Sequence, residues 1–577
     1  MLHSHPMKRW AVIKNFDDSK ANQLANELHV EPVIAKLLLQ RNVNTFEESR
    51  DFFRPTLDQL HNPFLMKDMD KAVERINHAI ANNQKVLVYG DYDVDGTTSV
   101  ALVYSFLKKQ LKNSEHIDFY IPDRYLEGYG ISFQGIDFAA ENNFSLIIAL
   151  DCGIKSIDKI DYANAKGVDF IICDHHRPGD EIPKAYAVLD AKREDCNYPF
   201  KELTGCGVGF KLLQGWCIHN KISTDTLFNS LDLVAISTAA DIVPINGENR
   251  ILSYYGLQEI NLNSRPAVKA ILQLTNIKRE LTISDIVFVI GPRINAAGRI
   301  DKAKKAVEFL ISESMPEAEI LGEGLQKTNS DRQNLDKTIT SEALQMIIDK
   351  GWEKRMSTVL FNSDWHKGVI GIVASRLTDK YYRPTIMLTE SNGMVTGSAR
   401  SVKNFDVYEA IELCSDLLIQ FGGHKYAAGL TLKRESVESF VDKFEEVVRV
   451  RMNPDWLIPE IEIDAELTLE ELTFKLLRII KQFAPFGPEN MAPVFASYNL
   501  TVADNPRVVG ESHLKFDVYD EKNPQVKFAA IAFNQAQHHD LINSTQKIDL
   551  AYAIEENEWN GTKMIQLNVK DIRPHTK

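Results

Sequence analysis

The sequence predicts an α/β protein built from several domains. Its 577 residues are too many for a single hydrophobic core, and this length is typical of roughly three or four domains. Short apolar runs alternate with helical stretches from residue 85 onward, and short β-like runs dominate beyond about residue 490. We therefore expect a parallel-sheet domain, a second α/β domain joined to it by a long helix, and a small C-terminal OB-like β-barrel.

The first α/β block contains five predicted strands. They are rich in β-branched residues and read KVLVYG, IDFYIP, SLIIALD, DFIICD and AYAVLD. After the first of them, apolar residues recur at helical spacing, at Val100, Val103, Tyr104, Leu107 and Leu111. This spacing predicts an amphipathic helix. The alternation of strands with helices predicts a largely parallel sheet that is covered on both faces.

The remaining chain divides by its local patterns. A long connecting helix is predicted by the segment PEAEILGEGLQKTNSDRQNLDKTITSEALQMIIDKG. The sequence contains no internal repeat. We expect five regions: an N-terminal extension (1–80), a first α/β domain (81–245), a helical region with the connecting helix (246–350), a second α/β domain (351–455) and an OB-like barrel (456–577).

Composition and charge exclude several classes of protein. The longest apolar runs have about seven residues, as in SLIIAL, whereas a membrane span needs about twenty, so we expect no membrane association. The first residues lack the apolar stretch of a secretory signal. Six scattered cysteines without a CxxC pair favour a reducing cytoplasm, and Cys152 and Cys173 are interpreted as packing residues. A net charge of -14 disfavours indiscriminate nucleic-acid binding but permits a local basic channel.

Acidic residues and histidines gather in four segments of the first block. GDYDVDG follows the first predicted strand, and the other segments supply Asp151, then Asp174 with His175 and His176, and finally Asp241 in STAADIVP. We interpret all four as strand ends. In an open parallel sheet, ligands bind outside the carboxyl ends of the strands, so these four segments are expected to meet in one crevice.

So many carboxylates in one crevice repel one another unless a cation compensates them. Each piece has a plainer interpretation: a lone Asp after a strand is often a helix cap, and DxDxDG resembles part of a calcium loop. The calcium interpretation fails because Leu102 stands where the twelfth-position Glu is required. Oxygen ligands with one or two imidazoles suit Mn²⁺ or Mg²⁺, and two such ions can activate a water and stabilise the leaving oxygen of a phosphodiester.

The same segments resemble a known family. GDYDVDG, ALDCG, CDHH and TAADIVP are similar, in this order, to the four phosphoesterase motifs of the DHH family, and GGHKYAAG resembles the signature of the DHH-associated domain. Other segments resemble the branch of this family that degrades single-stranded DNA: PDRYLEGYG, DCNYPFKELTGCGVGFK, FVIGPRINAAGRID, WHKGVIGIVASRL, GSARS and PFGPENMAPVF. The resemblance runs from about residue 50 to near the C-terminus, and it implies that the first α/β domain is the DHH-type catalytic domain and the second is the DHH-associated domain.

The resemblance also implies the roles of site residues. It assigns metal binding and catalysis to Asp93, Asp95, Asp151, His175, His176 and Asp241. Asp91 and Asp174 are included as metal ligands, with the alternative that they only orient ligands. The expected cofactors are two Mn²⁺ or Mg²⁺ ions, and water is the expected nucleophile. His176 is a further candidate for contact with the scissile phosphate.

Substrate contacts are expected outside the metal site. The glycines of GGHKYAAG let backbone N–H groups approach an anion, and GSARS offers a hydroxyl and a guanidinium for a phosphate. An aromatic residue, Tyr129 or Trp365, is expected either to stack on a base or to pack in a core. The basic stretch 291–306 is interpreted as a solvated helix face or, with the resemblance, as a channel wall. The candidate contacts are Arg124, Tyr129, Arg293, Arg299, Ser398, Arg400, Gly422, Gly423 and His424.

The expected function is therefore 5′→3′ exonuclease action on single-stranded DNA in recombination and repair, with mononucleotides as products. Two alternatives stay open: a DHH phosphoesterase acting on short oligonucleotides, and a non-catalytic nucleic-acid-binding scaffold. The first resembles shorter chains without a C-terminal barrel, and the second resembles relatives that have lost their ligands. The resemblance also implies two further partners, a single-strand-binding protein and a repair helicase.

Overall fold

The structure is a computed structural model that describes residues 8–14, 16–110, 113–503, 506–544 and 547–576. Its contacts divide the chain into two compact units, each described by itself below. The unit that contains the first α/β block, here called the catalytic unit, comprises Val43–Ser330 and Phe483–Ala492. The second unit comprises Met1–Asn42, Asp331–Gln482 and Pro493–Lys577. These units are groups of contacts, so the five ranges expected from the sequence stay a prediction.

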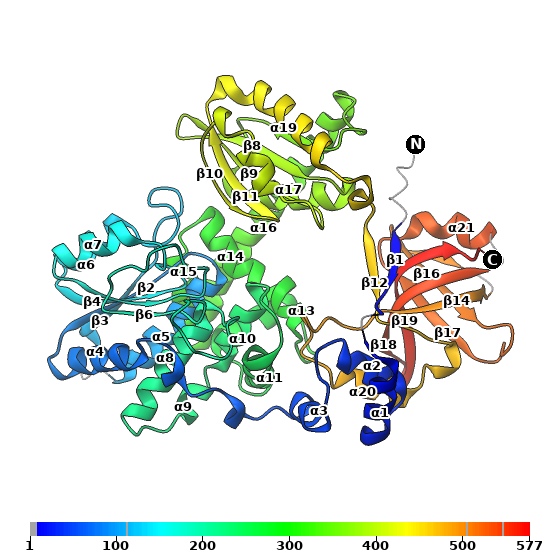
Figure 1. The fold of residues 1–577 in the computed structure, drawn as a ribbon, viewed down its shortest axis with the longest axis horizontal. Coiled ribbons are helices and arrows are strands. Elements are labelled where there is room, and N and C mark those ends of the chain that lie inside the picture. Colours follow the sequence, from blue (N-terminus) through cyan, green and yellow to red (C-terminus); the bar gives the residue numbers. More distant parts are fainter. Residues whose placement is uncertain (1–7, 15, 111–112, 504–505, 545–546, 577) are drawn as a thin grey trace. The chain divides into compact units, whose positions relative to one another are not determined.

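A five-stranded, fully parallel sheet lies at the centre of the catalytic unit (Figure 1). Its order is β3-β2-β4-β5-β6. The strands are β2 (Lys85–Gly90), β3 (Ile117–Tyr120), β4 (Phe144–Leu150), β5 (Asp169–Cys173) and β6 (Ala187–Leu189). All five strands expected from the apolar runs are confirmed, and so is their parallel arrangement.

Helices cover both faces of this sheet, as predicted. On one face Leu146, Ile148 and Leu150 of β4 share a core with α4 (Met69–Ala81), α5 (Val94–Gln110), α8 (Gly205–His219) and α10 (Leu231–Ala240). On the other face Ile147 and Ala149 pack with α6 (Phe133–Glu141) and α7 (Ile157–Ala165). Since both faces are buried, the strands read as continuous apolar runs rather than alternating ones.

Helix α5 corrects one expectation. The helix itself is confirmed, but it is not amphipathic: all residues from Val94 to Tyr104 are buried. It packs against the sheet on one side and against α8, α10 and α15 (Lys304–Leu310) on others, so no face of this stretch meets water. Leu111, the last residue of the expected apolar face, lies outside the described residues.

The region after the sheet is helical, as expected. A π-helix (Ile286–Ile290) leads directly into α14. The helices are α9 (Asp225–Phe228), α11 (Gly247–Leu262), α12 (Pro266–Thr275), α13 (Ile283–Asp285), α14 (Gly291–Ile300) and α16 (Met315–Asp349). With 35 residues, α16 confirms the predicted long connecting helix, and the boundary between the two units falls inside it.

The second unit contains a mixed five-stranded sheet of order β10-β11-β9-β8-β7. Strands β7 and β8 are parallel, and the other neighbours are antiparallel. The strands are β7 (Thr358–Phe361), β8 (Thr385–Ser391), β9 (Met394–Arg400), β10 (Leu418–His424) and β11 (Ala427–Leu432). The helices of this region are α17 (Lys367–Tyr381), α18 (Val407–Glu412) and α19 (Val437–Arg451). This sheet is the predicted second α/β domain.

A β-barrel occupies the end of the chain, as predicted. Strand β14 pairs with both β18 and β16, and β16, β17, β19 and β18 pair in succession, so five strands close a ring. A closed five-stranded barrel is the architecture of the OB-fold. Its sheet contains β13 (Ala465–Glu466), β14 (Phe495–Val502), β15 (Arg507–Val509), β16 (His513–Tyr519), β17 (Lys527–Ala532), β18 (Ile548–Trp559) and β19 (Thr562–Pro574).

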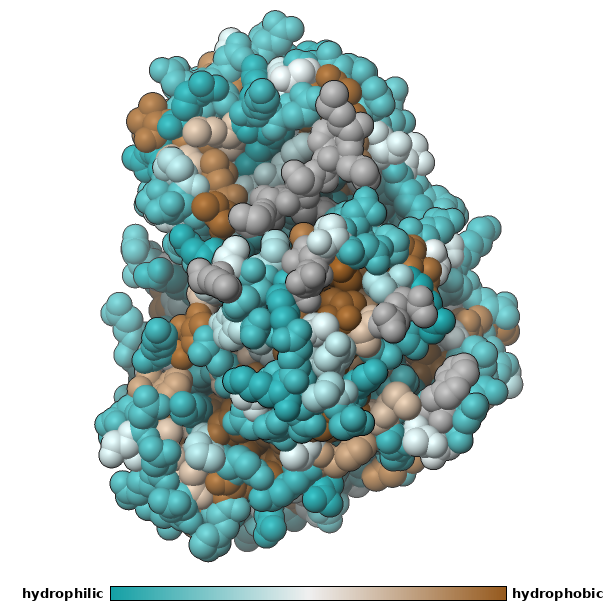
Figure 2. Space-filling model, turned by 90° about the vertical axis from the view of Figure 1, so that its right-hand side faces the viewer, coloured by the Kyte–Doolittle hydropathy of each residue, from teal (hydrophilic) through white to brown (hydrophobic). Residues whose placement is uncertain are grey.

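The N-terminal segment differs from the expected helices and loops in one respect. A short strand, β1 (Arg9–Val12), pairs in parallel with β12 (Glu460–Ile463). The remaining helices are α1 (Asp18–Leu28), α2 (Pro32–Leu39), α3 (Phe46–Phe53), α20 (Phe474–Lys481) and α21 (His539–Ser544). Among the described residues no helix is long and apolar enough to cross a membrane. On the face shown in Figure 2, hydrophobic residues are scattered among hydrophilic ones.

Candidate metal centre

The parallel sheet brings the acidic segments together at one edge. Asp91 follows β2, Asp151 follows β4 and Asp174 follows β5. Because these neighbouring strands are parallel, their carboxyl ends lie at the same edge of the sheet. Asp241 corrects the expectation for the fourth segment: it follows helix α10 as its C-cap and does not end a strand.

Seven side chains form three overlapping groups with metal-ligand geometry. Within each group the potential ligand atoms all lie within 4.8 Å of one another. The groups are Asp91 with Asp93 and Asp151, Asp95 with His175 and Asp241, and Asp151 with His175 and His176. Since Asp151 and His175 each belong to two groups, the donor set is continuous rather than three separate clusters.

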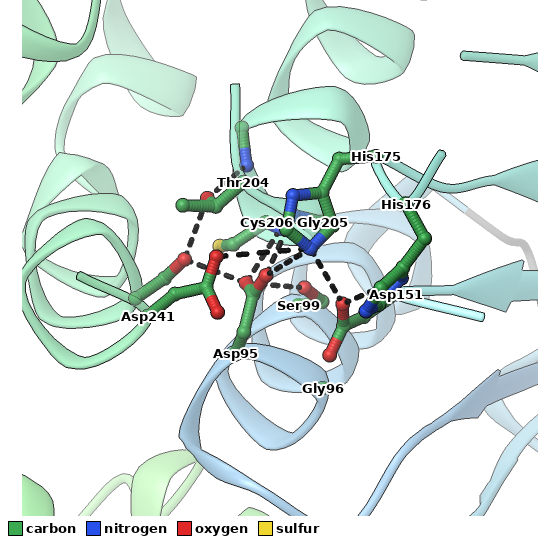
Figure 3. Close-up of polar contacts among 12 residues, drawn as sticks. Asp95, Gly96, Ser99, Asp151, His175, His176, Thr204, Gly205, Cys206 and Asp241 are labelled. Carbon is green, nitrogen blue, oxygen red and sulfur yellow. Dashed lines mark hydrogen bonds and ion pairs between the residues drawn. The ribbon is translucent and has the colours of Figure 1, made fainter. Parts of the chain in front are cut away.

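The imidazole of His175 lies at the centre of this set. Its Nε2 atom is 3.1 Å from Asp151 Oδ1, 3.6 Å from Asp95 Oδ2 and 3.7 Å from Asp241 Oδ2. In Figure 3 the three carboxylates point toward this ring from separate parts of the chain. Neither ring nitrogen has a hydrogen-bond partner among the described residues, and burial lowers the pKa of His175. A buried neutral imidazole without a hydrogen bond is available as a metal ligand.

The carboxylate of Asp95 is held by backbone groups at the start of α8. Its Oδ2 accepts a hydrogen bond from Gly205 N at 2.7 Å, and its Oδ1 accepts one from Cys206 N at 2.9 Å. The hydroxyl of Ser237 also donates to Oδ1, at 2.6 Å (Figure 3). These three contacts fix the orientation of the Asp95 side chain.

The group around Asp91 is crowded with carboxylates. Both carboxylate oxygens of Asp91 are buried without a hydrogen bond to a described residue. Burial raises the pKa of Asp91, and the nearby charge of Asp93 raises it further. Burial and then the charge of Asp95 likewise raise the pKa of Asp151, whose backbone has φ 59. A left-handed conformation is uncommon for a residue other than glycine and is frequent at functional sites.

Asp174 differs from the other carboxylates because one of its hydrogen bonds comes from the imidazole of His176. Oδ1 accepts from the backbone N–H groups of His175 and His176 and from His176 Nδ1, and Oδ2 accepts from Ile154 N. Burial opposes its ionisation, but the bond and charge of His176, with the bond from Ile154 N, together outweigh burial and lower the pKa of Asp174 to about 2. Asp174 is absent from all three groups. Through its bond to Nδ1, Asp174 fixes the orientation of the His176 ring.

The donor set fits divalent cations. Five carboxylates and two imidazoles supply hard oxygen ligands with a minority of nitrogen, which is the chemistry of Mn²⁺ and Mg²⁺ sites. Burial, with the charges of Asp95 and Asp93, raises the pKa of Asp241 to about 8. Since these buried carboxylates raise one another's pKa by charge repulsion, a cation of two or more charges is the natural counter-charge.

Three residues of this region, namely Thr204, Gly205 and Ser237, were not singled out from the sequence. Gly205 has no room for a side chain, since an added Cβ would lie 2.5 Å from the Cβ of Asp151. Ser237 donates to Asp95 and accepts a hydrogen bond from the Thr204 hydroxyl, whose Oγ1 is 2.6 Å away. The signals were present: Gly205 belongs to the glycine-rich TGCGVG, and Ser237 precedes Asp241 by one helical turn.

Two candidate substrate contacts lie beside the metal groups. The hydroxyl of Tyr129 is 3.1 Å from His176 Nε2, and its side chain is exposed. Arg124 stacks over the ring of Tyr92, 4.9 Å from the ring centroid, and lines a cavity of about 320 Å³. Tyr92 stands between Asp91 and Asp93 in the sequence, so Arg124 approaches the metal groups from that cavity.

The two arginines of α14 are engaged with the protein itself. Arg293 donates to Val289 O at 2.6 Å and to Gln326 Oε1 at 2.8 Å, and burial lowers its pKa. The carbonyl of Arg299 accepts a bond from the Tyr125 hydroxyl. The helix also lies against the first acidic segment, because an added Cβ on Gly298 would be 2.3 Å from Tyr92 O.

The other candidate contacts lie together on the mixed sheet of the second unit. Arg400 on β9 pairs with Ala427, which pairs with His424 on β10, and Ser398 and Gly422 both pair with Gly429. Arg400 donates to Ser398 Oγ at 3.0 Å. Nothing lies within 4 Å of the place where Gly422 would carry a Cβ, and Gly423 has φ 144. The hydroxyl, the guanidinium and an open stretch of glycine backbone therefore share one region.

Of the two aromatic residues left open by the sequence, Trp365 is a core residue. Its side chain is 3 % exposed and its Nε1 donates to Glu342 Oε2 at 2.8 Å. It packs with Val369 and Leu377 of α17. Stacking of Trp365 on a base is thus excluded, whereas Tyr129 is 56 % exposed.

Three family models match the chain. The model described as "DHH family, N-terminal domain" matches residues 85–238, the "DHHA1 domain" model matches residues 354–450, and the "RecJ OB domain" model matches residues 463–571. The first match covers the parallel sheet and every metal-group residue except Asp241.

Several relatives that match over most of their length carry the name RecJ. The chain is 36 % identical to the single-stranded-DNA-specific exonuclease RecJ of Bacillus subtilis, over 98 % of this chain and 70 % of the relative. It is 32 % identical to RecJ of Escherichia coli, over 94 % of this chain and 96 % of the relative. The crystal structure of RecJ in complex with Mn²⁺ from Thermus thermophilus has a TM-score of 0.84 at 26 % identity, covering 99 % of this chain and 80 % of that one. The DHH resemblance is confirmed, and the chain belongs to the RecJ family of single-stranded-DNA-specific exonucleases.

Proposed function

We propose that this protein hydrolyses single-stranded DNA from its 5′ end and releases mononucleotides, in DNA recombination and repair. One observation carries the proposal: the acidic and histidine segments expected from the sequence converge in a continuous, buried donor set. Because every position of that set is retained, the alternative of a non-catalytic scaffold loses its main argument. The C-terminal barrel likewise disfavours the alternative of an enzyme for short oligonucleotides, which resembles shorter chains.

We assign the metal-holding role to Asp91, Asp93, Asp95, Asp151, His175, His176 and Asp241. Asp174 is assigned an orienting role instead, because it belongs to none of the three groups and its Oδ1 accepts the bond from His176 Nδ1. When bound, two Mn²⁺ or Mg²⁺ ions supply the Lewis acidity that activates a water and stabilises the leaving oxygen of a phosphodiester.

The side chains around these ligands perform three tasks. Ser237 and the start of α8 hold Asp95 in one orientation, so its position does not depend on the substrate. Asp174 accepts the Nδ1 proton of His176, which fixes the ring and directs Nε2 toward the Tyr129 hydroxyl. Nε2, the ring nitrogen that Asp174 leaves free, is the atom that would hold a cation or, in place of one, contact a phosphate oxygen of the DNA.

Contacts to the DNA are proposed on both units. Within the catalytic unit they are Arg124, Tyr129, Arg293 and Arg299, of which Tyr129 and Arg124 lie next to the metal groups. In the second unit they are Ser398, Arg400, Gly422, Gly423 and His424, which we propose as a clasp for a phosphate, in particular at the 5′ end.

The cellular setting is also a proposal. The six cysteines are buried free thiols, which suits a reducing cytoplasm. A single-strand-binding protein and a repair helicase are proposed as partners on family likeness alone.

The test is digestion of end-labelled single-stranded DNA with Mn²⁺, with the 5′ or the 3′ end blocked in turn. Blocking the 5′ end should stop nucleotide release, and blocking the 3′ end should not. The Asp151→Ala variant should release no nucleotides but should still bind the strand. Release that depends on the 3′ end would contradict the polarity, and binding without release by the unmodified protein would favour the scaffold.

A further inference from the structure

A ten-residue segment from the C-terminal region is physically part of the catalytic unit. Residues Phe483–Ala492 group by their contacts with Val43–Ser330, although the chain on either side of them belongs to the second unit. The segment lies inside residues 463–571, which match the OB-domain family model. A sequence-based domain boundary therefore assigns it to the barrel, whereas its contacts assign it to the catalytic unit.

The base of the segment is anchored firmly. The ring of Phe483 is fully buried, with centroids 5.4 Å from Phe52 and 5.1 Å from Phe53. The guanidinium of Arg250, on α11, donates to the carbonyl oxygens of Phe483 at 2.8 Å and Ala484 at 3.1 Å. These contacts fix where the segment begins.

The segment then folds back on itself as a rigid loop. The side-chain amide of Asn490 is buried and donates to Phe483 O and to Pro485 O, both at 2.8 Å. The backbones of Gly487 and Asn490 exchange two hydrogen bonds, of 3.1 and 2.9 Å. With its base and its two sides held in this way, the loop presents its tip in one conformation.

The tip of the loop contacts the turn that follows Asp241. Pro488 O accepts a hydrogen bond from Ile245 N at 2.8 Å, and the carboxylate of Glu489 accepts one from the side-chain amide of Asn246. The fit is close, since a Cβ added to Gly487 would lie 2.4 Å from Cγ1 of Ile245. The loop thus holds the turn four and five residues beyond Asp241.

This turn needs support because its backbone is strained. Ile242 has φ 60, and a β-branched side chain in the left-handed region is a marked outlier. Such conformations persist only where the surroundings determine them. One support comes from α11, where Asn249 donates to Pro244 O at 3.0 Å. The contacts made by Pro488 and Glu489 are a second polar support of this turn.

We propose that Pro488 and Glu489 are positioning residues for Asp241. By fixing Ile245 and Asn246, they keep the strained turn in the conformation that directs Asp241 Oδ2 toward His175 Nε2, 3.7 Å away. The inference rests on the proposed function, in which Asp241 holds a divalent cation. Loss of the contact therefore weakens cation binding and leaves binding of single-stranded DNA unchanged.

The test is Mn²⁺ binding, measured by calorimetry on the full chain without DNA. Glu489→Ala should bind Mn²⁺ roughly tenfold more weakly at one site, a loss typical of residues that orient metal ligands. Glu489→Gln should restore binding, because its amide oxygen still accepts the bond from Asn246. Glu511→Ala serves as the matched control, since Glu511 is an exposed carboxylate of the barrel region. All variants should have the unfolding temperature and DNA affinity of the unmodified protein.

A double-variant cycle identifies the contact itself. Asn246→Ala should match Glu489→Ala, and the combination should be no weaker than either alone, because the two side chains share one hydrogen bond. Gly487→Ala, which forces the loop against Ile245, should be at least as weak as Glu489→Ala. If Gly487→Ala fails to fold, the Glu489→Ala and Glu489→Gln variants still test the inference, because the side chain of Glu489 is exposed and its replacement should not disturb folding.

Two results would overturn the inference: Mn²⁺ affinity of Glu489→Ala equal to that of the unmodified protein, or additive losses in the double variant. Failure of the proposed function is distinguishable from both. An unmodified protein that binds Mn²⁺ but releases no nucleotides would defeat the nuclease assignment, whereas the calorimetry needs no turnover and still reports on Asp241.

Discussion

The two five-stranded sheets arrange their candidate functional residues in different ways. In the parallel sheet of the catalytic unit, the candidates lie beyond the strand ends, where Asp91, Asp151 and His175 are buried together. In the mixed sheet of the second unit, Ser398, Arg400 and His424 lie on the strands themselves, in rows set by the register. A parallel sheet gathers loops at one edge, whereas antiparallel pairing aligns side chains across neighbouring strands.

This difference has a consequence for mutation. The strand-end site is crowded and buried, so small changes of volume displace several ligands at once. The strand-face site is more open, as the space around Gly422 shows, so each side chain there is expected to act more independently. The four predictions below test this contrast, beginning with the largest effect.

Gly205→Ala should reduce nuclease activity on the order of 100-fold, because a displacement of about 1 Å at a reacting centre has an effect of this size. The added methyl group would lie 2.5 Å from the Cβ of Asp151, so Asp151 or α8 must move. The measurement is single-turnover digestion of single-stranded DNA. Gly324→Ala is the control, since this helical glycine has nothing within 4 Å of an added Cβ. Equal activity of both variants would show that the strand-end site tolerates displacement.

The metal-free protein should lose stability as the pH rises. Burial, with the charges of Asp95 and Asp93, raises the pKa of Asp241 from 3.8 to about 8, so the folded chain keeps a proton that the unfolded chain has released. For His176 burial lowers the pKa, but the bond to Asp174 and the charges of Asp174, Asp241 and Asp95 together outweigh burial and raise the pKa from 6.5 to about 9, which has the same sign. Through Asp241 alone, the free energy of unfolding should fall by at most about 1.4 kcal/mol per pH unit between pH 3.8 and about 8.

The measurement is the thermal unfolding temperature of chelator-treated protein from pH 5 to 8. Addition of Mn²⁺ should remove the decline, because the cation replaces the protons as counter-charge. The Asp241→Asn variant should show a shallower decline. Stability that rises with pH in the absence of metal would contradict the assignment of this cluster.

Arg400→Ala should weaken binding of 5′-phosphorylated single-stranded DNA about tenfold, the effect of about 1.4 kcal/mol. It should also lower the dependence of binding on salt by about one counterion, as expected for loss of one phosphate contact. Fluorescence anisotropy at several salt concentrations measures both. Arg449→Ala, an exposed arginine on α19, is the control. An unchanged salt dependence for Arg400→Ala would remove the phosphate clasp from the strand-face site.

Trp365→Phe should leave activity and DNA binding within about twofold of the unmodified protein. It removes the bond to Glu342 from a buried ring, so the free energy of unfolding should fall by about 0.5–1.5 kcal/mol. Denaturant titration and the digestion assay check the two parts. A large loss of DNA binding at unchanged stability would restore Trp365 as a stacking residue.

Local patterns were sufficient where the physics is local. Apolar runs with β-branched residues predicted β2 to β6 correctly, because strands buried on both faces require such runs. The 35-residue helix α16 was equally visible in its segment. The pattern after β2 predicted α5 but not its burial, because periodicity reports the apolar positions and not how many neighbours pack around them.

Long-range contacts were beyond the sequence. The strand β1 has four residues and forms only because β12, about 450 residues further along, pairs with it. In the same way, the interpretation of Asp174 depended on which groups fill its hydrogen-bonding capacity, and that of Trp365 depended on Glu342. Apart from His175 and His176, which follow Asp174 directly, these partners are distant in the chain from the residues that they contact.

The sequence by itself determined the candidate ligands of this protein: residues of the right chemistry, in four segments whose order matches the DHH family, three of which follow recognisable strands. Only the tertiary structure decided which oxygens remain available for a cation. Asp91 is left without hydrogen bonds, Asp174 is saturated, and Asp241 is held by a turn that a distant loop supports. The reason is physical: residue type sets what a group can bind, whereas its availability depends on every donor that folding brings within about 3 Å.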